Sequence, residues 1–217
     1  MKFRQIFAPV LLTALAPLAI SCGDASDDLD LLQSALRPEA PRQHPRAVTL
    51  AQQRPIPPRL EVGFPARDLS GVMLLERERA GVQTWLSADG ASISLQAGLL
   101  TTTKGFGSGL AGSDVADIAK ILRSGRGGYG ERVHSFLNGN DQIELRAYKC
   151  ELGLVDQEIL FFKGQAVTAE KVSEHCYGVT EKFENTYWLR PGTGQILQSS
   201  QWTGNFLGNL FMKVVPE

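Results

Sequence analysis

Hydrophobic and polar residues alternate along most of the chain after Leu60, and this period of two predicts short β-strands separated by turns. Asp89-Gly90 lies between two such runs and is a strong hairpin signal. The stretches Asn138–Asp141 and Pro191–Gly194 have the composition of turns as well. The pattern predicts strands near residues 72–78, 82–87, 92–96, 99–104, 132–137, 142–148, 158–162, 183–190, 195–202 and 210–215.

One segment has helical spacing instead. Ser113-Asp114 is its predicted cap and Gly125 its predicted end. Between them the apolar residues of one face are Val115, Ile118, Ala119, Ile121 and Leu122. Because the strands follow one another without alternating helices, we expect an antiparallel sheet. Residues 59–217 are therefore predicted to be one mainly β domain, an antiparallel β-barrel or strongly curled sheet with one short helix.

The first 21 residues are a predicted export signal. Lys2 and Arg4 precede an apolar stretch over residues 6–20, which as a helix reaches about 22 Å against a bilayer core of about 30 Å. A basic start before a short apolar run is typical of a cleaved signal peptide. The run ends in Leu18-Ala19-Ile20-Ser21-Cys22, which is similar to a lipobox except that Leu18 is one place further out than usual. There are two alternatives to a lipoprotein signal: an ordinary signal peptide with an incidental cysteine, and an N-terminal anchor that is not cleaved.

We predict that Cys22 is the lipid attachment site of the mature chain. A cysteine of this type carries three acyl chains, palmitate among them, and two or more chains anchor a protein stably where one binds reversibly. Asp24 lies one place later than the aspartate that favours inner-membrane retention in enteric bacteria. We therefore expect attachment to the outer membrane, with the protein facing the periplasm.

Residues 22–58 are predicted to be a lipidated N-terminus and tether. An acidic, polar start and a short leucine-rich segment precede a stretch with six prolines, at positions 38, 41, 45, 55, 57 and 58. Proline-rich linkers are semi-rigid spacers, which suits a domain that stands off a bilayer. Simple disorder is the alternative and is compatible with a tether.

Charge excludes some classes of partner. The chain has 22 basic and 23 acidic side chains, and Lys2 and Arg4 belong to the predicted signal, so 20 basic and 23 acidic groups remain, a net charge of −3. No basic stripe is present to bind nucleic acid, and no polybasic patch to bind an anionic membrane. Membrane attachment is thus expected through the acyl chains.

Cys150 and Cys176 remain as a pair once Cys22 is acylated. In an oxidising compartment such a pair predicts a disulfide, worth about 3.5 kcal/mol for a loop of about 27 residues. Two free thiols, or a metal half-site with His175, are the alternatives. A neighbouring Cys-His pair cannot fill a tetrahedral site by itself, and the usual CxxC spacing is absent.

No motif in the sequence indicates an enzyme, a cofactor or a metal site. The chain has no GxSxG, HExxH or P-loop. Lys104 precedes the glycines of the Gly105–Gly109 loop, where a phosphate-binding loop has its lysine after them. Asp114 and Asp117 suit a helix N-terminus, and His134 lies in a predicted strand.

The tryptophans suggest a binding role. Trp85, Trp188 and Trp202 all lie in predicted strands, and Gln198, Gln201 and Asn205 are close to Trp202 in sequence. Aromatic rings stack on pyranose faces while amides bind hydroxyl groups, so these six residues are candidate saccharide contacts, with Trp202 and the three amides as one candidate platform. Core packing is the alternative, and it is the more general role of a bulky aromatic residue in a strand.

Three stretches of the predicted β domain carry distinctive motifs: residues 84–90 (TWLSADG), 98–106 (GLLTTTKGF) and 183–204, which runs from FENTYW to QSSQWTG. Together they resemble the YjbF/GfcB lipoprotein family. The region of Cys150 and Cys176 is similar to the alphaproteobacterial branch. The resemblance covers most of residues 65–217 and implies a mostly antiparallel β fold, an outer-membrane location and an association with exopolysaccharide or group 4 capsule loci. It carries over no catalytic residues.

The leading hypothesis is therefore a non-enzymatic accessory in exopolysaccharide or capsule export or assembly. Its partners would be the membrane, polysaccharide and export-machinery proteins. A periplasmic carrier or chaperone for lipids or lipoproteins is a second hypothesis, since a curled sheet can enclose an apolar cavity. A structural envelope lipoprotein is a third.

Overall fold

The computed structural model describes residues 43–107, 109–140, 142–162 and 164–215. Its elements are α2 (Pro45–Ala51), β1 (Arg59–Phe64), the 3-10 helix η1 (Pro65–Arg67), β2 (Leu69–Arg79), β3 (Val82–Ser87), β4 (Ser92–Gln96), β5 (Leu99–Lys104), β6 (Leu110–Asp114), α3 (Ala116–Ser124), β7 (Gly128–Leu137), β8 (Ile143–Phe162), β9 (Gln165–Tyr177), β10 (Lys182–Arg190), β11 (Gln195–Trp202) and β12 (Asn209–Val215).

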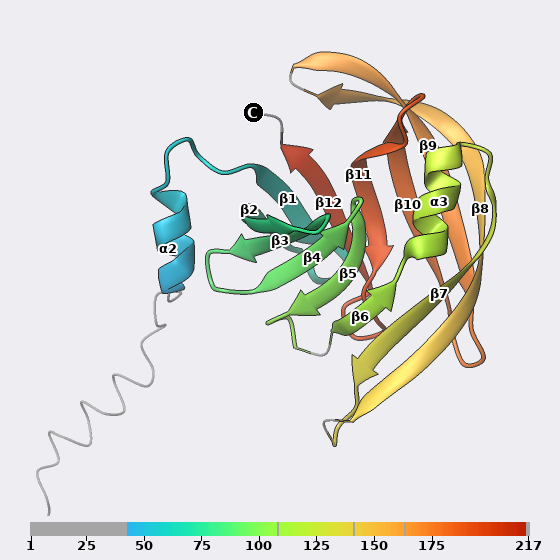
Figure 1. The fold of residues 1–217 in the computed structure, drawn as a ribbon, viewed down its shortest axis with the longest axis horizontal. Coiled ribbons are helices and arrows are strands. Elements are labelled where there is room, and N and C mark those ends of the chain that lie inside the picture. Colours follow the sequence, from blue (N-terminus) through green and yellow to red (C-terminus); the bar gives the residue numbers. More distant parts are fainter. Residues whose placement is uncertain (1–42, 108, 141, 163, 216–217) are drawn as a thin grey trace, which may run out of the picture. The chain divides into compact units, whose positions relative to one another are not determined.

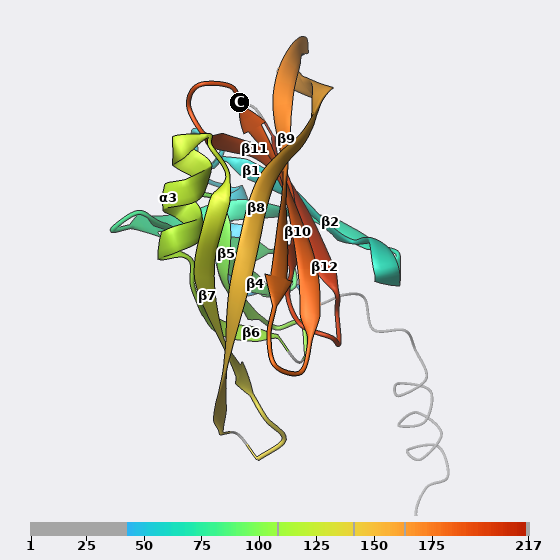
Figure 2. The ribbon, with the colours of Figure 1, turned by 90° about the vertical axis from the view of Figure 1, so that its right-hand side faces the viewer.

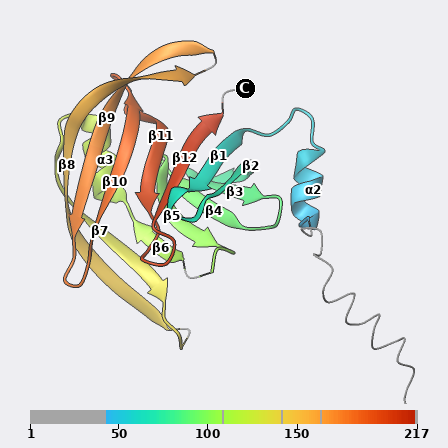
Figure 3. The ribbon, with the colours of Figure 1, turned by 180° about the vertical axis from the view of Figure 1, so that it is seen from behind.

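All twelve strands form one sheet, in the order β5-β4-β3-β2-β1-β12-β11-β10-β9-β8-β7-β6, and every pairing is antiparallel. The sheet curls until its edge strands β5 and β6 lie near each other (Figures 1 and 3). Backbone pairing is replaced there by one side-chain bond, in which the N–H of Leu110 donates to Thr103 Oγ1 at 2.9 Å. The fold is a nearly closed antiparallel barrel, as the alternation predicted.

The interior of the barrel is filled by side chains from most of its strands. Alternate residues of β10, for example, are buried from Phe183 to Leu189, because successive side chains of a strand point to opposite faces. One continuous core cluster includes Leu60, Met73, Trp85, Ile93, Leu99, Leu110, Ile118, Tyr187, Leu210 and Met212.

Helix α3 joins β6 to β7 (Figure 2). It packs into this core through Ile118 and Leu122. It ends before Gly125, whose φ of 65° is the left-handed conformation that glycine adopts without strain, so this helix end is predicted correctly. The start of the helix differs from the prediction, because Ser113 and Asp114, the predicted cap, are the last two residues of β6. Asp114 still accepts a bond at Oδ1 from the N–H of Ala116, 3.0 Å away.

A second helix, α2, lies within residues assigned to the tether. Pro45 occupies its first turn, where a missing N–H costs nothing, and Ala47 and Leu50 pack on Leu86 in a small separate cluster. Residues 45–51 are therefore helical, because two of their apolar side chains cover a surface of the sheet. Residues 22–42 lie outside the described chain.

The hairpin of β8 and β9 is much longer than the sequence pattern indicates. Predicted strands at 142–148 and 158–162 are parts of one 20-residue strand, β8. The pairing register shifts between Leu154 and Asp156, so a bulge reverses the alternation and hides the continuity. Strands β1, β6 and β9 were not predicted as strands. The structure therefore has twelve strands where the sequence pattern predicted about ten.

The predicted signal peptide and Cys22 also lie outside the described residues. Among the residues that are described, no helix is long and apolar enough to cross a membrane.

Candidate functional site

Strands β10 and β11 separate at one end of the barrel. Their backbone pairing stops at Thr186 and Ser200. Beyond this point side-chain amides bridge the gap: Asn185 Oδ1 accepts from the N–H of Trp202 at 2.7 Å, and Asn209 Nδ2 donates to the carbonyl of Glu184 at 2.8 Å. Two asparagines thus link the strands where the backbone pairing of β10 and β11 ends.

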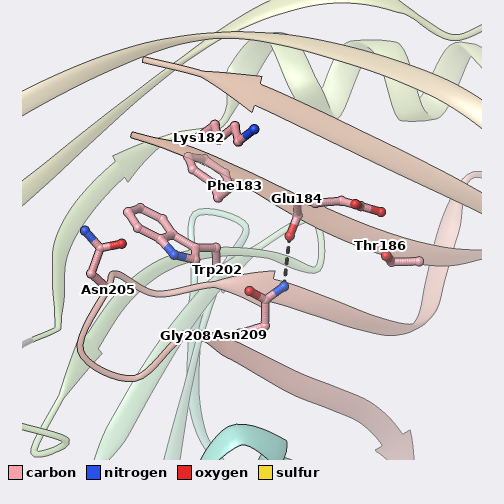
Figure 4. A pocket seen from close by; sticks show the side chains of 8 residues that line it. All are labelled: Lys182, Phe183, Glu184, Thr186, Trp202, Asn205, Gly208 and Asn209. Atoms are coloured by element: carbon pink, nitrogen blue, oxygen red, sulfur yellow. Dashed lines mark hydrogen bonds between the residues drawn. The ribbon is translucent and has the colours of Figure 1, made fainter. Parts of the chain in front are cut away.

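A pocket of about 510 Å³, open to solvent, lies at this opening (Figure 4). The rings of Phe183 and Trp202 stack behind it with centroids 4.5 Å apart and planes within 5°. Both rings are more than nine-tenths buried, so they offer the pocket only an edge of aromatic surface. The lining residues are Lys182, Phe183, Glu184, Thr186, Trp202, Asn205, Gly208 and Asn209.

An aromatic cluster continues inward from this stack. His134 is almost parallel to Phe183 and to Trp202, with centroids 5.3 and 5.7 Å away, and Phe136 and Tyr148 lie at its edges. His134 is 1% exposed, and neither ring nitrogen has a hydrogen-bond partner among the described residues. Burial, together with the charge of Arg132, lowers its pKa from 6.5 to about 3, so the imidazole is neutral.

A polar network borders the pocket on the side of Asn205. The carboxylate of Glu181 accepts bonds from Arg146 Nη1 at 2.9 Å, from Asn205 Nδ2 at 2.8 Å and from the hydroxyl of Tyr148. Burial acts to raise the pKa of Glu181, but these hydrogen bonds outweigh burial and the pKa is lowered. Burial and the same carboxylate raise the pKa of Tyr148. Glu181 therefore holds the β9–β10 and β11–β12 loops and β8 together as a charged group.

Gln201 and Gln198, two of the candidate saccharide contacts, take different positions. Gln201 is buried, accepts from the N–H of Leu100 at 2.8 Å and donates to the carbonyl of Gly98 at 2.9 Å. It therefore ties β11 to the edge of the sheet at β5, a role that local sequence gives no sign of. Gln198 is half-buried on β11 and pairs with Trp188 of β10.

The three tryptophans are likewise dispersed. Trp85 is 3% exposed and belongs to the core cluster. Trp188 is half-buried on the outer side of β10, where its Nε1 donates to Glu158 Oε2 at 2.7 Å. Of the candidate contacts, Trp202 and Asn205 line the pocket. The structure thus favours the core alternative for Trp85 and does not join all the candidate residues into one platform.

The cysteine pair lies beside a buried ion pair. Cys150 and Cys176 face each other on β8 and β9 with Cα atoms 4.1 Å apart and form a disulfide. Their sulfurs lie within 4.8 Å of a Glu174 carboxylate oxygen, but bonded sulfurs offer no thiolate to a metal. Glu174 instead accepts from Arg132, through Nε at 2.9 Å and Nη2 at 3.0 Å, and from Tyr187.

This ion pair is fully enclosed. Glu174 and Tyr187 are both 0% exposed and Arg132 is 2% exposed. Burial acts to lower the pKa of Arg132, but the charge of Glu174 and the interactions with Tyr187, including the hydrogen bonds to both residues, together outweigh burial and raise this pKa. Burial raises the pKa of Tyr187. The network joins β7, β9 and β10 inside the barrel, which stabilises one relative arrangement of these strands as long as each partner is present.

The fold defines a class of protein: a nearly closed twelve-stranded barrel with a polar, asparagine-rich opening. The family model of the group 4 capsule polysaccharide lipoprotein GfcB/YjbF matches residues 43–215, and the chain belongs to this family. The family is thus one of capsule-associated lipoproteins, located at a membrane of the cell envelope.

A solved structure has the same fold. The crystal structure of the hypothetical lipoprotein YmcC from Escherichia coli (K12) superposes with a TM-score of 0.65 at 16% sequence identity, covering 90% of this chain and 97% of that one. No curated protein sequence matches the chain.

Proposed function

We propose that this protein is an outer-membrane lipoprotein that acts, without catalysing a reaction, in the export or assembly of a capsular or extracellular polysaccharide. The family match over residues 43–215 is the observation that carries this proposal. The lipobox-like sequence ending at Cys22 supports a lipid anchor, and Gly23-Asp24 supports outer-membrane sorting. The disulfide between Cys150 and Cys176 is consistent with an oxidising compartment such as the periplasm.

The pocket between β10 and β11 is the proposed contact with saccharide. Its rim offers two amides, a hydroxyl, an ammonium and a carboxylate, from Asn205, Asn209, Thr186, Lys182 and Glu184. These groups match the alternating donors and acceptors of sugar hydroxyls. The exposed edge of the Phe183–Trp202 stack adds an apolar patch for the C–H groups of a pyranose ring.

A carrier of acyl chains has less support. Such a carrier needs an enclosed apolar cavity, whereas the barrel interior of the described residues is filled by the core cluster around Tyr187 and Leu210. A partly enclosed apolar space between α3 and β8–β10 has a volume of only about 50 Å³. This is far below the volume that a lipid chain needs.

Deletion of the gene tests the role in the cell. We expect the surface polysaccharide to change in amount or chain length, and a plasmid copy to restore it. A copy with Cys22→Ser should fail to restore it, because the protein is no longer held at the membrane. An unchanged polysaccharide in the deletion strain would contradict the proposed function.

Titration with the purified polysaccharide of the same cells, followed by tryptophan fluorescence, tests the pocket. Trp202 should report binding because it lines the pocket. Lys182→Ala and Asn205→Ala should each weaken binding by about 3- to 10-fold, the effect of one lost hydrogen bond. Lys120→Ala, an exposed change on α3, is the matched control and should have no effect. Equal affinities for all four proteins would exclude this pocket.

A further inference from the structure

The β8–β9 hairpin extends beyond the rest of the sheet as a two-stranded ribbon (Figures 1 and 2). The pairing of β7 with β8 ends at Leu152, and the pairing of β10 with β9 ends at Glu170. The two strands continue to pair with each other as far as Phe162 and Gln165. Both strands therefore have free edges along the ribbon, and an isolated two-stranded ribbon is only marginally stable in water.

The end of this ribbon is apolar on both of its faces. Ile159 and Phe161 are 68% and 71% exposed on one face, and Leu160 and Phe162 lie half-buried on the other. No acidic residue occurs between Ile159 and Thr168. A protein partner seated on one face would leave the other face in water, whereas a lipid interface surrounds a narrow ribbon on both sides. The shape and composition thus favour lipid over protein.

Polar and aromatic groups lie directly behind the apolar end. Trp188 and Lys171 both bind the carboxylate of Glu158, each at 2.7 Å, and Lys171 Nζ lies 5.4 Å from the Trp188 ring. Arg190 lies over the ring of Phe162 at 5.5 Å. Tryptophan with lysine and arginine is the residue combination found at the boundary between lipid chains and water. Here this combination would mark the depth at which insertion stops.

The predicted anchor leaves the orientation of the domain open. Cys22 and Gln43 are 21 positions apart, and extended chain of this length reaches about 70 Å at most. Strand β8, with 20 residues, is about 66 Å long. Either end of the barrel can therefore approach the bilayer, and a second contact is needed to select one.

We propose that the end of the β8–β9 ribbon, Ile159 to Phe162, docks into the interface of the membrane that carries the acyl anchor. This inference rests on the proposed lipid anchor. The docking is shallow, about 5–10 Å, because the free strand edges carry backbone groups that cannot enter the hydrocarbon core unpaired. The opposite end of β8, which the β7–β8 hairpin occupies, then faces away from the membrane together with its polar turn.

A depth measurement on the intact, acylated protein tests this orientation. Two variants each carry one added cysteine as a labelling site. Ala166→Cys puts the label opposite Phe161 in the ribbon, and Asn140→Cys puts it in the polar turn at the other end of β8. Each variant protein is labelled with an environment-sensitive fluorophore and reconstituted into vesicles of phosphatidylethanolamine and phosphatidylglycerol with brominated acyl chains. We expect quenching of the label at residue 166 and none at residue 140.

A charge at the ribbon end should undo the docking. Phe161→Asp in the Ala166→Cys protein should lower the ratio of docked to undocked molecules by about 10-fold or more, since most of the Phe161 side chain would otherwise leave water. Ile143→Asp is the matched control. It places the same charge at a residue that is 69% exposed at the far end of β8, and it should leave the quenching unchanged.

The outcomes separate this inference from the anchor itself. A protein that floats with the vesicles but has an unquenched label at residue 166 overturns the ribbon contact and leaves the anchor standing. Equal quenching at residues 166 and 140 overturns it too. A dimer in detergent that Phe161→Asp dissociates would show that a second copy covers the ribbon. A protein that does not float contradicts the anchor, and with it the docking.

Discussion

His134 lies in the aromatic cluster behind the pocket and makes the stability of the barrel depend on pH. Its pKa is about 3 in the folded protein because the ring is enclosed, and about 6.5 in the unfolded chain. Below pH 6.5 the unfolded state therefore binds a proton that the folded state does not. Stability must fall as the pH drops from 6.5 toward 3, and it is fully present above this range.

The size of this effect follows from the two pKa values. Between pH 7 and pH 5 the unfolded histidine becomes almost fully protonated while the folded one stays neutral, which costs about 2 kcal/mol. This window lies above the range in which carboxylates titrate. The pKa values of Glu181 and Asp89 are lowered by folding, so protonation of these carboxylates reduces the free energy of unfolding further, but only below about pH 4.5.

Substitution of His134 by phenylalanine isolates the contribution of this histidine to the pH dependence of stability. Phenylalanine retains the stacking on Phe183 and Trp202 and buries no unpaired nitrogen. Urea unfolding at pH 7, 6 and 5 should show a loss of about 2 kcal/mol for the wild type and a nearly flat profile for His134→Phe. Equal slopes for the wild type and His134→Phe would refute the reasoning.

Three further changes test the rest of the barrel. Glu174→Gln leaves the buried charge of Arg132 without its partner, so urea unfolding should show a loss of about 3–5 kcal/mol, and a loss below roughly 1 kcal/mol would contradict this account. Gln201→Leu removes the bonds to two backbone groups at the sheet edge, and we expect about 2 kcal/mol of destabilisation with faster amide exchange in β5. Cys150→Ala with Cys176→Ala should cost about 3.5 kcal/mol in the same unfolding assay, and an unchanged midpoint would show that the disulfide adds nothing.

Local sequence signals account for the fold class and for several elements. Alternation and turn residues predicted the antiparallel barrel, and Gly125 marked the end of α3, because both are decided within a few neighbouring residues. The pairing of Cys150 with Cys176 followed from counting cysteines. The bulge after Leu154 shows the limit of this approach, since one extra residue reverses the alternation and made a single strand look like two.

The candidate site depended on contacts that no local pattern reports. The residues of the ion pair, Arg132 and Glu174, are 42 positions apart, and the bond from Leu100 to Gln201 spans 101 positions. Gln201 was predicted to be a ligand-binding amide, whereas its partners are backbone groups of a distant strand. Asn185 and Asn209, which link the strands beside the pocket, carry no motif either. Their role is visible only once β10 and β11 are seen to separate.

The most direct test of the proposed function is the mass of the N-terminal peptide of the mature protein, purified from the membrane fraction of its own cells. The account predicts a polypeptide that begins at Cys22 and carries three acyl chains, released from outer-membrane fractions by detergent. A mature chain that begins at any other residue, or an unmodified Cys22 thiol, would contradict it.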